Sequence, residues 1–273
     1  MKILELTSDI VFRSFMLSPN TINYKSRLLH LITKIPEEAL KKAVYTSQEL
    51  RASNKNNKIF RTDILVTVGN HIISIEMNNE YYDGLLIKNN NYVSKLSSEQ
   101  LEKGEDYLKY KKIIAINIDN FHLYDGDKIV YEFMMKEIET GELEYDFYKS
   151  YHIDLKNVKD VRYNKNEINK MLNIFVTDDL NSLKGDKIMD EAIEALERLK
   201  LEEKYIGLYD KEKVERKIFN TRIKNATLEG KDEGIKEEKT NIARKMLESN
   251  MKVEDISKFT GLTKKEIEKL KNI

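Results

Sequence analysis

The stretch from Arg61 to Asn78, RTDILVTVGNHIISIEMN, limits the fold of this chain more than any other segment. Two runs rich in β-branched residues flank Gly69-Asn70. Such runs around a two-residue turn that contains glycine are typical of a β-hairpin. Closing that turn pairs Val68 with His71, and this pair sets the register of the whole ladder, because strand side chains alternate strictly between the two faces.

The predicted register puts charged residues opposite each other at the open end of the hairpin. Asp63 faces Glu76, and Arg61 faces Asn78. Opposed residues of antiparallel strands share a face of the sheet, with Cβ atoms about 4.5–5.5 Å apart. The other face carries the apolar residues, which are Ile64, Val66, Val68, Ile73 and Ile75. Two facing carboxylates destabilise a sheet, and a bound divalent cation is the simplest reason for keeping them.

The composition indicates a folded protein with long regular elements. The chain has 273 residues, of which 40% are hydrophobic, with only 2 prolines and 10 glycines. It has no cysteine, which excludes disulfides and thiolate zinc sites and fits a reducing compartment. No run approaches the roughly 20 apolar residues that cross a bilayer, and the first residues lack the apolar segment of a signal peptide. We therefore expect a soluble, cytoplasmic protein without a membrane partner.

Net charge separates two kinds of nucleic-acid protein. The chain has 47 basic and 47 acidic residues, so it lacks the overall positive charge of a tight, non-specific binder. An enzyme that holds nucleic acid through a local patch remains open. The histidines show no metal-ligand spacing, and the chain has neither a glycine-rich phosphate loop nor the G-x-S-x-G turn of a serine hydrolase.

The hydrophobic pattern predicts helices and strands in an order typical of an α/β fold. Helices are expected over 9–31, with a break at Pro19-Asn20, and around 92–108. Strands are expected over 43–50 and over 112–118, the second of these covered on both faces. Two further strands and two amphipathic helices follow, over 128–136, 143–155, 166–175 and 186–206. Together with the hairpin they predict a mixed sheet flanked by helices.

The C-terminal part of the chain has a pattern of its own. Residues 211–239 are dense in mixed charge and predict an exposed helix or linker. Residues 240–273 fit three short helices, with Thr260-Gly261-Leu262 between the second and the third, as in a helix-turn-helix. The third helix, 264–271, offers lysines but no Arg, Asn or Gln on its first turns to read base edges. We therefore favour a helical cap, or an element that forms a homo-oligomer, over a DNA-reading element.

An ordered set of segments resembles the PD-(D/E)XK nuclease family transposases, which include the recombination-promoting nucleases. The segments are SDIVFRSFM near the N-terminus, TDILV and IEMN in the hairpin, SSEQLEKGEDY, and IAINI. The tail, EGKDEGIKEE followed by IARKMLESNMKVEDISKFTGLTKKEI, is also similar to these proteins. The set covers most of the chain and is far more specific than a bare D-x(n)-E-x-K triplet.

The resemblance implies an α/β, restriction-endonuclease-like mixed sheet flanked by helices, with a helical C-terminal region. In that fold, acids on two neighbouring central strands hold Mg²⁺, which polarises the scissile phosphate and helps to generate the attacking hydroxide. These acids correspond here to Asp63 and Glu76, with the Met77 backbone carbonyl as a third ligand. Mg²⁺ prefers such hard oxygen ligands and keeps several waters, and Mn²⁺ is the alternative ion.

Position 78 departs from the usual pattern of the superfamily. Asn78 stands where most of its members have a lysine and where this family often has Gln. An amide orients water or a phosphate oxygen, but it brings no charge to offset developing negative charge. We expect Arg61, opposite Asn78, to supply that charge, unless it only forms an ion pair with Asp63 or Glu76.

Three further residues match weaker parts of the family pattern. Asp9 corresponds to an acid on an N-terminal helix and is either a metal ligand or, as we prefer, an acid that caps its own helix after Thr7-Ser8. Gln100 and Tyr107 are seven residues apart and are expected on one helical face. There they resemble residues that some nucleases of the superfamily use near the phosphate, although a tyrosine at such a position is more often a packing residue.

The expected organisation is a nuclease-like core over 1–160, a helical extension over 161–210, a charged helix or linker over 211–239, and a helix-turn-helix-like tail over 240–273. The expected function is a divalent-metal-dependent DNA endonuclease that hydrolyses phosphodiester bonds and promotes recombination or mobile-element activity. The alternative is a catalytically inactive DNA-binding or protein-interaction module on the same fold. Asn78 and the zero net charge favour that alternative.

Overall fold

The computed structural model describes residues 5–50, 60–101, 105–144, 146–201 and 203–270. The chain divides into two compact units, Met1–Asp210 and Lys211–Ile273. Each unit is described by itself below. None of the helices in the described ranges is both long and apolar enough to cross a membrane.

A mixed sheet forms the centre of the first unit. The described strands follow the spatial order β1-β2-β3-β4-β6-β5. Their bounds are Val44–Leu50 for β1, Phe60–Val68 for β2, His71–Asn78 for β3, Lys112–Asp119 for β4, Val130–Met134 for β5 and Tyr148–Asp154 for β6. β4 runs parallel to β3 and to β6, whereas the remaining neighbours are antiparallel. The predicted mixed sheet is therefore confirmed.

The hairpin of β2 and β3 has the predicted register. Val68 pairs with His71, and the ladder continues to Ile64 opposite Ile75. Gly69 has a φ of 51°. A type II′ turn requires such a positive φ at its first central residue, and glycine adopts it without the steric penalty of a Cβ atom. A local sequence signal thus determines which residues of the two strands face each other.

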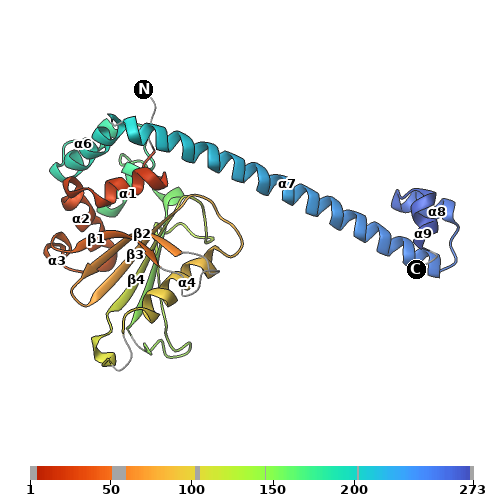
Figure 1. Ribbon diagram of the computed structural model, residues 1–273, viewed down its shortest axis with the longest axis horizontal. Coiled ribbons are helices and arrows are strands. Elements are labelled where there is room, and N and C mark those ends of the chain that lie inside the picture. The colour runs from red at the N-terminus through yellow and green to blue at the C-terminus, as the bar shows by residue number, and fades with distance from the viewer. Residues whose placement is uncertain (1–4, 51–59, 102–104, 145, 202, 271–273) are drawn as a thin grey trace. The chain divides into compact units, whose positions relative to one another are not determined.

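Helices cover both faces of the sheet (Figure 1). The bounds are Asp9–Leu17 for α1, Ile22–Thr33 for α2, Glu37–Lys41 for α3, Leu85–Ser98 for α4, Glu167–Leu172 for α5 and Lys187–Leu201 for α6. Short 3₁₀ helices lie at Pro19–Thr21, Tyr107–Lys109, Leu155–Asn157, Asn173–Phe175 and Leu180–Leu183. The apolar hairpin face packs in the main core with residues of α1, α2, α5 and α6, while α4 packs through Leu96 against Leu65 and Ile113 on the opposite face. Each strand of the hairpin is therefore buried between two helical layers.

Residues after the sheet belong to the same core. Met171 and Leu172 of α5 and Ile193 and Leu196 of α6 are all buried in the cluster that contains the hairpin residues. Helices α5 and α6, which lie in the part that the sequence predicts as an extension, thus complete the core that supports β2 and β3. Removing them would expose the apolar face of the sheet to water.

The helix predicted around 92–108 is shorter than expected. α4 ends at Ser98. Just beyond it, the Gln100 side chain accepts a hydrogen bond from the Lys111 N–H at 2.8 Å and donates one to the Lys111 carbonyl at 3.1 Å. These bonds tie the end of the helix to the residue that precedes β4, so tertiary contacts end an element that apolar spacing alone would extend.

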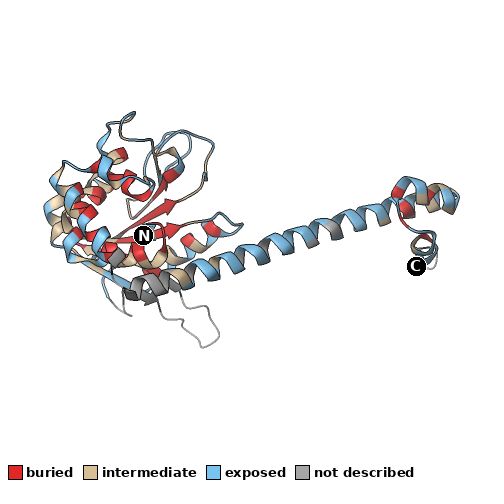
Figure 2. Ribbon diagram, turned by 90° about the horizontal axis from the view of Figure 1, so that it is seen from above, coloured by how far each residue is buried: buried red, intermediate tan, exposed pale blue. Residues whose placement is uncertain are grey.

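The second unit is helical. α7 spans Glu203–Glu248 and is exposed along most of its described length (Figure 2), and it is followed by α8, Val253–Thr260, and α9, Lys264–Leu270. Its small core consists of Ala243, Ile256, Leu262 and Ile267. Gly261, with a φ of 73°, ends α8, because glycine tolerates the left-handed conformation of a helix C-terminus. The second and third predicted short helices correspond to α8 and α9, whereas the first is not separate but continues α7.

Candidate active site

Asp63 and Glu76 lie side by side where β2 and β3 leave their ladder. The Asp63 backbone N–H donates to the Glu76 Oε1 at 3.3 Å, and the Met77 backbone N–H donates to the Asp63 Oδ2 at 3.0 Å. Each carboxylate therefore binds the backbone of the opposite strand. The Asp63 side chain is 17% exposed and that of Glu76 is 7% exposed, so both are reached from solvent only at their outer edge.

This arrangement is electrostatically unfavourable for the ionised form of Glu76. Burial, reinforced by the negative charge of Asp63, raises the pKa of Glu76 to about 8. Two cations lie near the pair. The Lys88 Nζ is 3.7 Å from the Glu76 Oε2, and the Arg13 Nε is 3.8 Å from the Asp63 Oδ1. Both distances exceed the 2.7–2.9 Å typical of a direct charge-assisted hydrogen bond, so the two cations offset the repulsion only in part.

Lys88 is held beside Glu76 by α4. Its Nζ also lies 5.2 Å from the centre of the Tyr92 ring. Burial is the largest single effect and lowers the pKa of Lys88, but Glu76, Tyr92, Tyr82 and Asp63 together outweigh it, and the net pKa is raised. Lys88 is therefore a cation at neutral pH and places a positive charge next to the carboxylate pair.

The donor set suits a hard divalent cation. Asp63 and Glu76 offer carboxylate oxygens, and the Met77 carbonyl is a third oxygen on the same strand. In the part of the chain that the structure describes, no group of three or more His, Asp or Glu side chains could hold a metal ion. Mg²⁺ tolerates so few protein ligands because it retains several waters. A cation would also offset the burial and the repulsion from Asp63 that together raise the pKa of Glu76.

Asn78 is oriented by buried residues of the neighbouring strands. Its Nδ2 donates to the Asp119 Oδ1 at 2.8 Å, and the backbone carbonyl of Asn78 accepts from the Asn120 N–H at 2.8 Å. The Asp119 Oδ2 in turn lies 2.8 Å from the His152 Nδ1. Asn78, Asp119 and His152 are each no more than 5% exposed. They form a continuous chain of hydrogen bonds from β3 through β4 to β6.

Two family models match the chain over most of its length. The model of the PD-(D/E)XK nuclease family transposases matches residues 7–224. This chain belongs to that family. The model of the C-terminal HTH domain of the Rpn/YhgA-like nuclease family matches residues 236–272. No curated protein matches the chain.

Membership of the PD-(D/E)XK nuclease family transposases makes nuclease activity or DNA binding the function class of this protein. The HTH match concerns the last turns of α7 together with α8 and α9. Helix-turn-helix domains bind DNA. The match therefore favours a DNA-binding role for this region over the helical cap that the sequence alone favours.

Of the other predicted site residues, Asp9 begins a helix that approaches the carboxylate pair, whereas only the backbone of Arg61 is described. Arg61 belongs to β2 and pairs with Glu49 of β1, but its side chain lies outside the described residues. Asp9 is the first residue of α1, and its carbonyl accepts from the Arg13 Nε at 3.3 Å. Because Arg13 also approaches Asp63, α1 brings its first turn close to the carboxylates. An acid in that turn is favoured by the helix dipole.

Gln100 and Tyr107 do not share a helical face, and that prediction was wrong. Both the oxygen and the nitrogen of the Gln100 amide are hydrogen-bonded to the backbone of Lys111. Tyr107 lies in a separate 3₁₀ helix, is 82% exposed, and stacks on Tyr110 with ring centres 6.4 Å apart. The helix that would have joined the two residues ends at Ser98.

Sequence reasoning missed four residues of this site. Arg13 and Lys88 carry no local signal, because only the packing of α1 and α4 on the sheet brings them to the carboxylates. Asp119 and His152 did have a signal. Polar residues alternate with apolar ones at the ends of their strands, in INID and YHID, and such alternation marks residues that share one face of a sheet.

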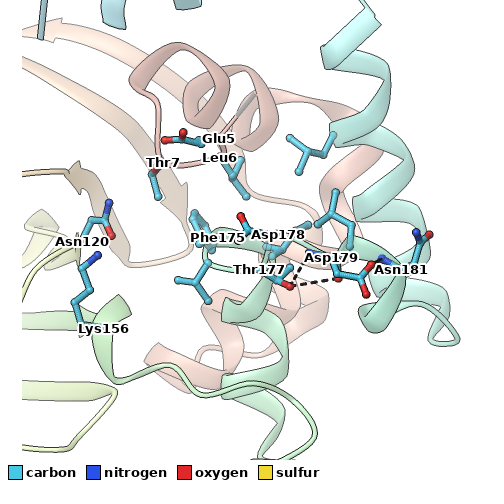
Figure 3. A pocket seen from close by; sticks show the side chains of 14 residues that line it. Glu5, Leu6, Thr7, Asn120, Lys156, Phe175, Thr177, Asp178, Asp179 and Asn181 are labelled. Carbon is cyan, nitrogen blue, oxygen red and sulfur yellow. Dashed lines mark hydrogen bonds between the residues drawn. The ribbon is translucent and has the colours of Figure 1, made fainter. Parts of the chain in front are cut away.

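A cavity of about 460 Å³ lies near the ends of β4 and β6, beside the residues that precede α1 (Figure 3). Its lining includes Asn120 and Lys156 but not Asp63, Glu76 or Asn78. The acidic residues Glu5, Asp178 and Asp179 also line it. Because Asp63, Glu76 and Asn78 do not line it, the cavity is separate from the candidate active site, and three acids against one lysine disfavour a phosphate group there.

Proposed function

We propose that this protein is a divalent-metal-dependent endonuclease that hydrolyses phosphodiester bonds in DNA and thereby promotes recombination or the activity of a mobile element. The observation that carries the proposal is the pair Asp63 and Glu76, held together on adjacent central strands in spite of its repulsion. Membership of the nuclease family supports the same chemistry. Clusters of groups with a strongly shifted pKa are common at functional sites.

Asp63, Glu76 and the Met77 carbonyl would hold Mg²⁺ or Mn²⁺, with Asp9 as a further candidate ligand. When bound, such an ion would polarise the scissile phosphate and lower the pKa of the attacking water. Hydrolysis adds the oxygen of that water to phosphorus and breaks the bond from phosphorus to one sugar oxygen. The water loses one proton, and the leaving oxygen takes up one.

The protein supplies charge and orientation around that reaction. Lys88, 3.7 Å from Glu76, is placed to offset the negative charge that develops on the phosphate. Arg13, 3.8 Å from Asp63, holds that carboxylate against α1. Arg61 is a further candidate for the cationic role. Asn78 orients water or a phosphate oxygen, but it contributes no charge.

The C-terminal unit would hold the substrate. Lys265 and Lys269 are exposed on α9, and lysines at such positions bind phosphates without reading the base sequence. The Lys264 Nζ, in contrast, is 2.8 Å from the Glu254 Oε1 and links α9 to α8. We therefore assign α9 a role in affinity more than in sequence preference.

The second candidate function is an inactive DNA-binding module. Two observations favour it: each carboxylate already has a cation nearby, and position 78 has no positive charge. In that case Asp63 and Glu76 would be structural ion-pair partners. The two functions differ in whether the purified protein cleaves DNA.

Incubation of the full-length protein with supercoiled plasmid separates the two functions. We expect nicking that requires Mg²⁺ or Mn²⁺, stops with a chelator and is lost in Asp63→Ala. Asp127→Ala is the matched control, because Asp127 is an exposed loop residue outside the site, and it should cleave like the wild type. Equal trace cleavage by all three proteins would indicate a contaminating nuclease. Retained DNA binding without cleavage would establish the inactive module.

A further inference from the structure

The amide of Asn78 has one orientation that its neighbours allow. Its Nδ2 is 2.8 Å from the Asp119 Oδ1. An ionised carboxylate only accepts hydrogen bonds, so the donor end of the amide must face it. No described residue donates to the Asn78 Oδ1. The oxygen of Asn78 is consequently the end of the amide that remains for other partners.

Asp119 is itself held by His152. The second oxygen of Asp119, Oδ2, lies 2.8 Å from the His152 Nδ1. On the far side of the imidazole, Nε2 is 3.5 Å from the Asn117 Nδ2, which also approaches the Tyr151 carbonyl at 3.4 Å. A carbonyl only accepts, so this nitrogen of Asn117 is a donor to both groups. His152 therefore carries its proton on Nδ1 and donates it towards Asp119.

The imidazole ring is also fixed by packing. The Tyr124 ring meets it edge-on at 5.6 Å between ring centres, and the Phe133 ring does so at 5.9 Å. His152 and Asp119 are 5% and 1% exposed. Turning the imidazole would break its contacts with Asp119 and the buried Asn117 and would displace the two aromatic rings, so the orientation of His152 is transmitted through Asp119 to Asn78.

We propose that Asp119 and His152 are positioning residues that fix Asn78 as a hydrogen-bond acceptor for the attacking water. This proposal rests on the proposed nuclease function. It gives position 78 a role opposite to that of a lysine, which only donates. The positive charge of the site then comes from other residues, such as Lys88 on α4, and not from position 78.

Exchanging the two polar groups tests the orientation directly. In Asp119→Asn the side chain at position 119 is no longer only an acceptor, so it no longer holds the nitrogen of the Asn78 amide towards β4. We expect kcat to fall about 10–100-fold with KM within twofold. In the double variant Asn78→Asp with Asp119→Asn, the amide at position 119 donates to the carboxylate at position 78. The other oxygen of that carboxylate is still an acceptor for water. We expect this exchange to restore kcat to within about fivefold of the wild type. Restoration would not occur if position 78 had to donate.

Two further sets of variants separate positioning from general damage. Asp154→Asn is the matched control, because Asp154 neighbours Asp119 in the sheet, is 3% exposed and also binds a histidine, with its Oδ2 2.9 Å from the His122 Nδ1, yet it does not contact Asn78. It should keep the wild-type kcat. His152→Asn keeps a donor at the place of Nδ1, so it should retain more activity than His152→Ala. All variants are compared at equal fractions folded, measured by circular dichroism.

The proposal is overturned if Asp119→Asn keeps the wild-type kcat, or if the exchange is no more active than Asp119→Asn alone. If the wild-type protein does not cleave DNA with any metal, the nuclease function fails, and the orientation is then measured by NMR of ¹⁵N-labelled asparagine side chains. We expect the Asn78 amide, assigned with Asn78→Ser, to be protected from exchange in the wild type and in Asp154→Asn but not in Asp119→Asn. An unprotected amide in the wild type would overturn the proposed orientation by itself.

Discussion

Among the described residues, the first unit buries some of its charged side chains and the second unit buries none. In the first unit Glu76 is 5% exposed and Asp119 is 1% exposed, and both are held by partners from other strands or helices. In the second unit Lys265 and Lys269 of α9 are exposed. A buried charge is expensive unless it is paired, whereas a solvated charge costs little. Under the proposed function, the buried charges of the first unit serve local chemistry and the exposed charges of the second unit attract DNA over a longer range.

If this division holds, a change in the carboxylate pair abolishes cleavage and spares binding. Glu76→Gln keeps the shape of the side chain but removes one negative oxygen ligand. We expect cleavage to fall at least about 1,000-fold, which is about 4 kcal/mol in activation free energy, with DNA affinity within twofold. Plasmid nicking and fluorescence anisotropy measure the two quantities. Glu144→Gln, at an exposed site, should change neither, and a parallel loss of affinity would contradict the division.

Lys88 provides a narrower test of the same unit. Removal of its positive charge in Lys88→Ala should lower kcat about 100-fold, as does the loss of one preorganised group that stabilises a transition state. Lys95→Ala is the control on the same helix, because Lys95 pairs with Glu99 at 3.1 Å and not with the carboxylates. Single-turnover rates at saturating DNA would show the difference. Equal rates for the two variants would show that Lys88 does not supply the positive charge and would point to Arg13 or Arg61 instead.

The second unit should respond in the opposite way. Lys265→Ala with Lys269→Ala removes two exposed charges from α9. We expect the dissociation constant for DNA to rise about tenfold at low salt, with the salt dependence lowered by about one unit for each lysine that contacts a phosphate. The rate at saturating DNA should not change. Lys217→Ala with Lys231→Ala, at exposed sites of α7, makes the same change in net charge, and an equal effect there would refute a specific role for α9.

The smallest expected effect concerns stability without metal. The pKa of Glu76 is raised from 4.5 to about 8, so the folded state binds this proton more tightly than the unfolded state. The contribution of Glu76 to stability is thus complete below pH 4.5 and is lost as the pH rises towards 8. In the presence of a chelator, the free energy of unfolding of Glu76→Gln should exceed that of the wild type by at least about 1 kcal/mol at pH 8. The two values should be equal near pH 4.5.

Urea unfolding at both pH values measures this difference. Added Mg²⁺ should stabilise the wild type, because a ligand of the folded state shifts the unfolding equilibrium, and it should not stabilise Glu76→Gln. A constant difference at all pH values would show that the gain does not come from ionisation of the carboxyl group.

Local patterns of the sequence determined much of the fold. The glycine turn and the alternation around it specified the register of β2 and β3, because side chains on a strand alternate between faces and a shift by one residue would expose the apolar set. The same reasoning brought Asp63 next to Glu76. The helix-turn-helix-like tail was visible from apolar spacing, although spacing favoured a helical cap, and only the match to a C-terminal HTH domain favoured DNA binding.

Only the tertiary structure decided what surrounds the carboxylates. Lys88 reaches Glu76 because α4 packs on the sheet, and the length of α4 itself depends on the bonds from Gln100 to Lys111. The orientation of Asn78 depends on Asp119, 41 residues later, and through it on His152, a further 33 residues on. Such partners are not encoded in local spacing, because they meet only when β3, β4 and β6 align in parallel. The sequence thus determined that Asp63 and Glu76 face each other. The alignment of distant strands decided that the nitrogen of the Asn78 amide points towards Asp119.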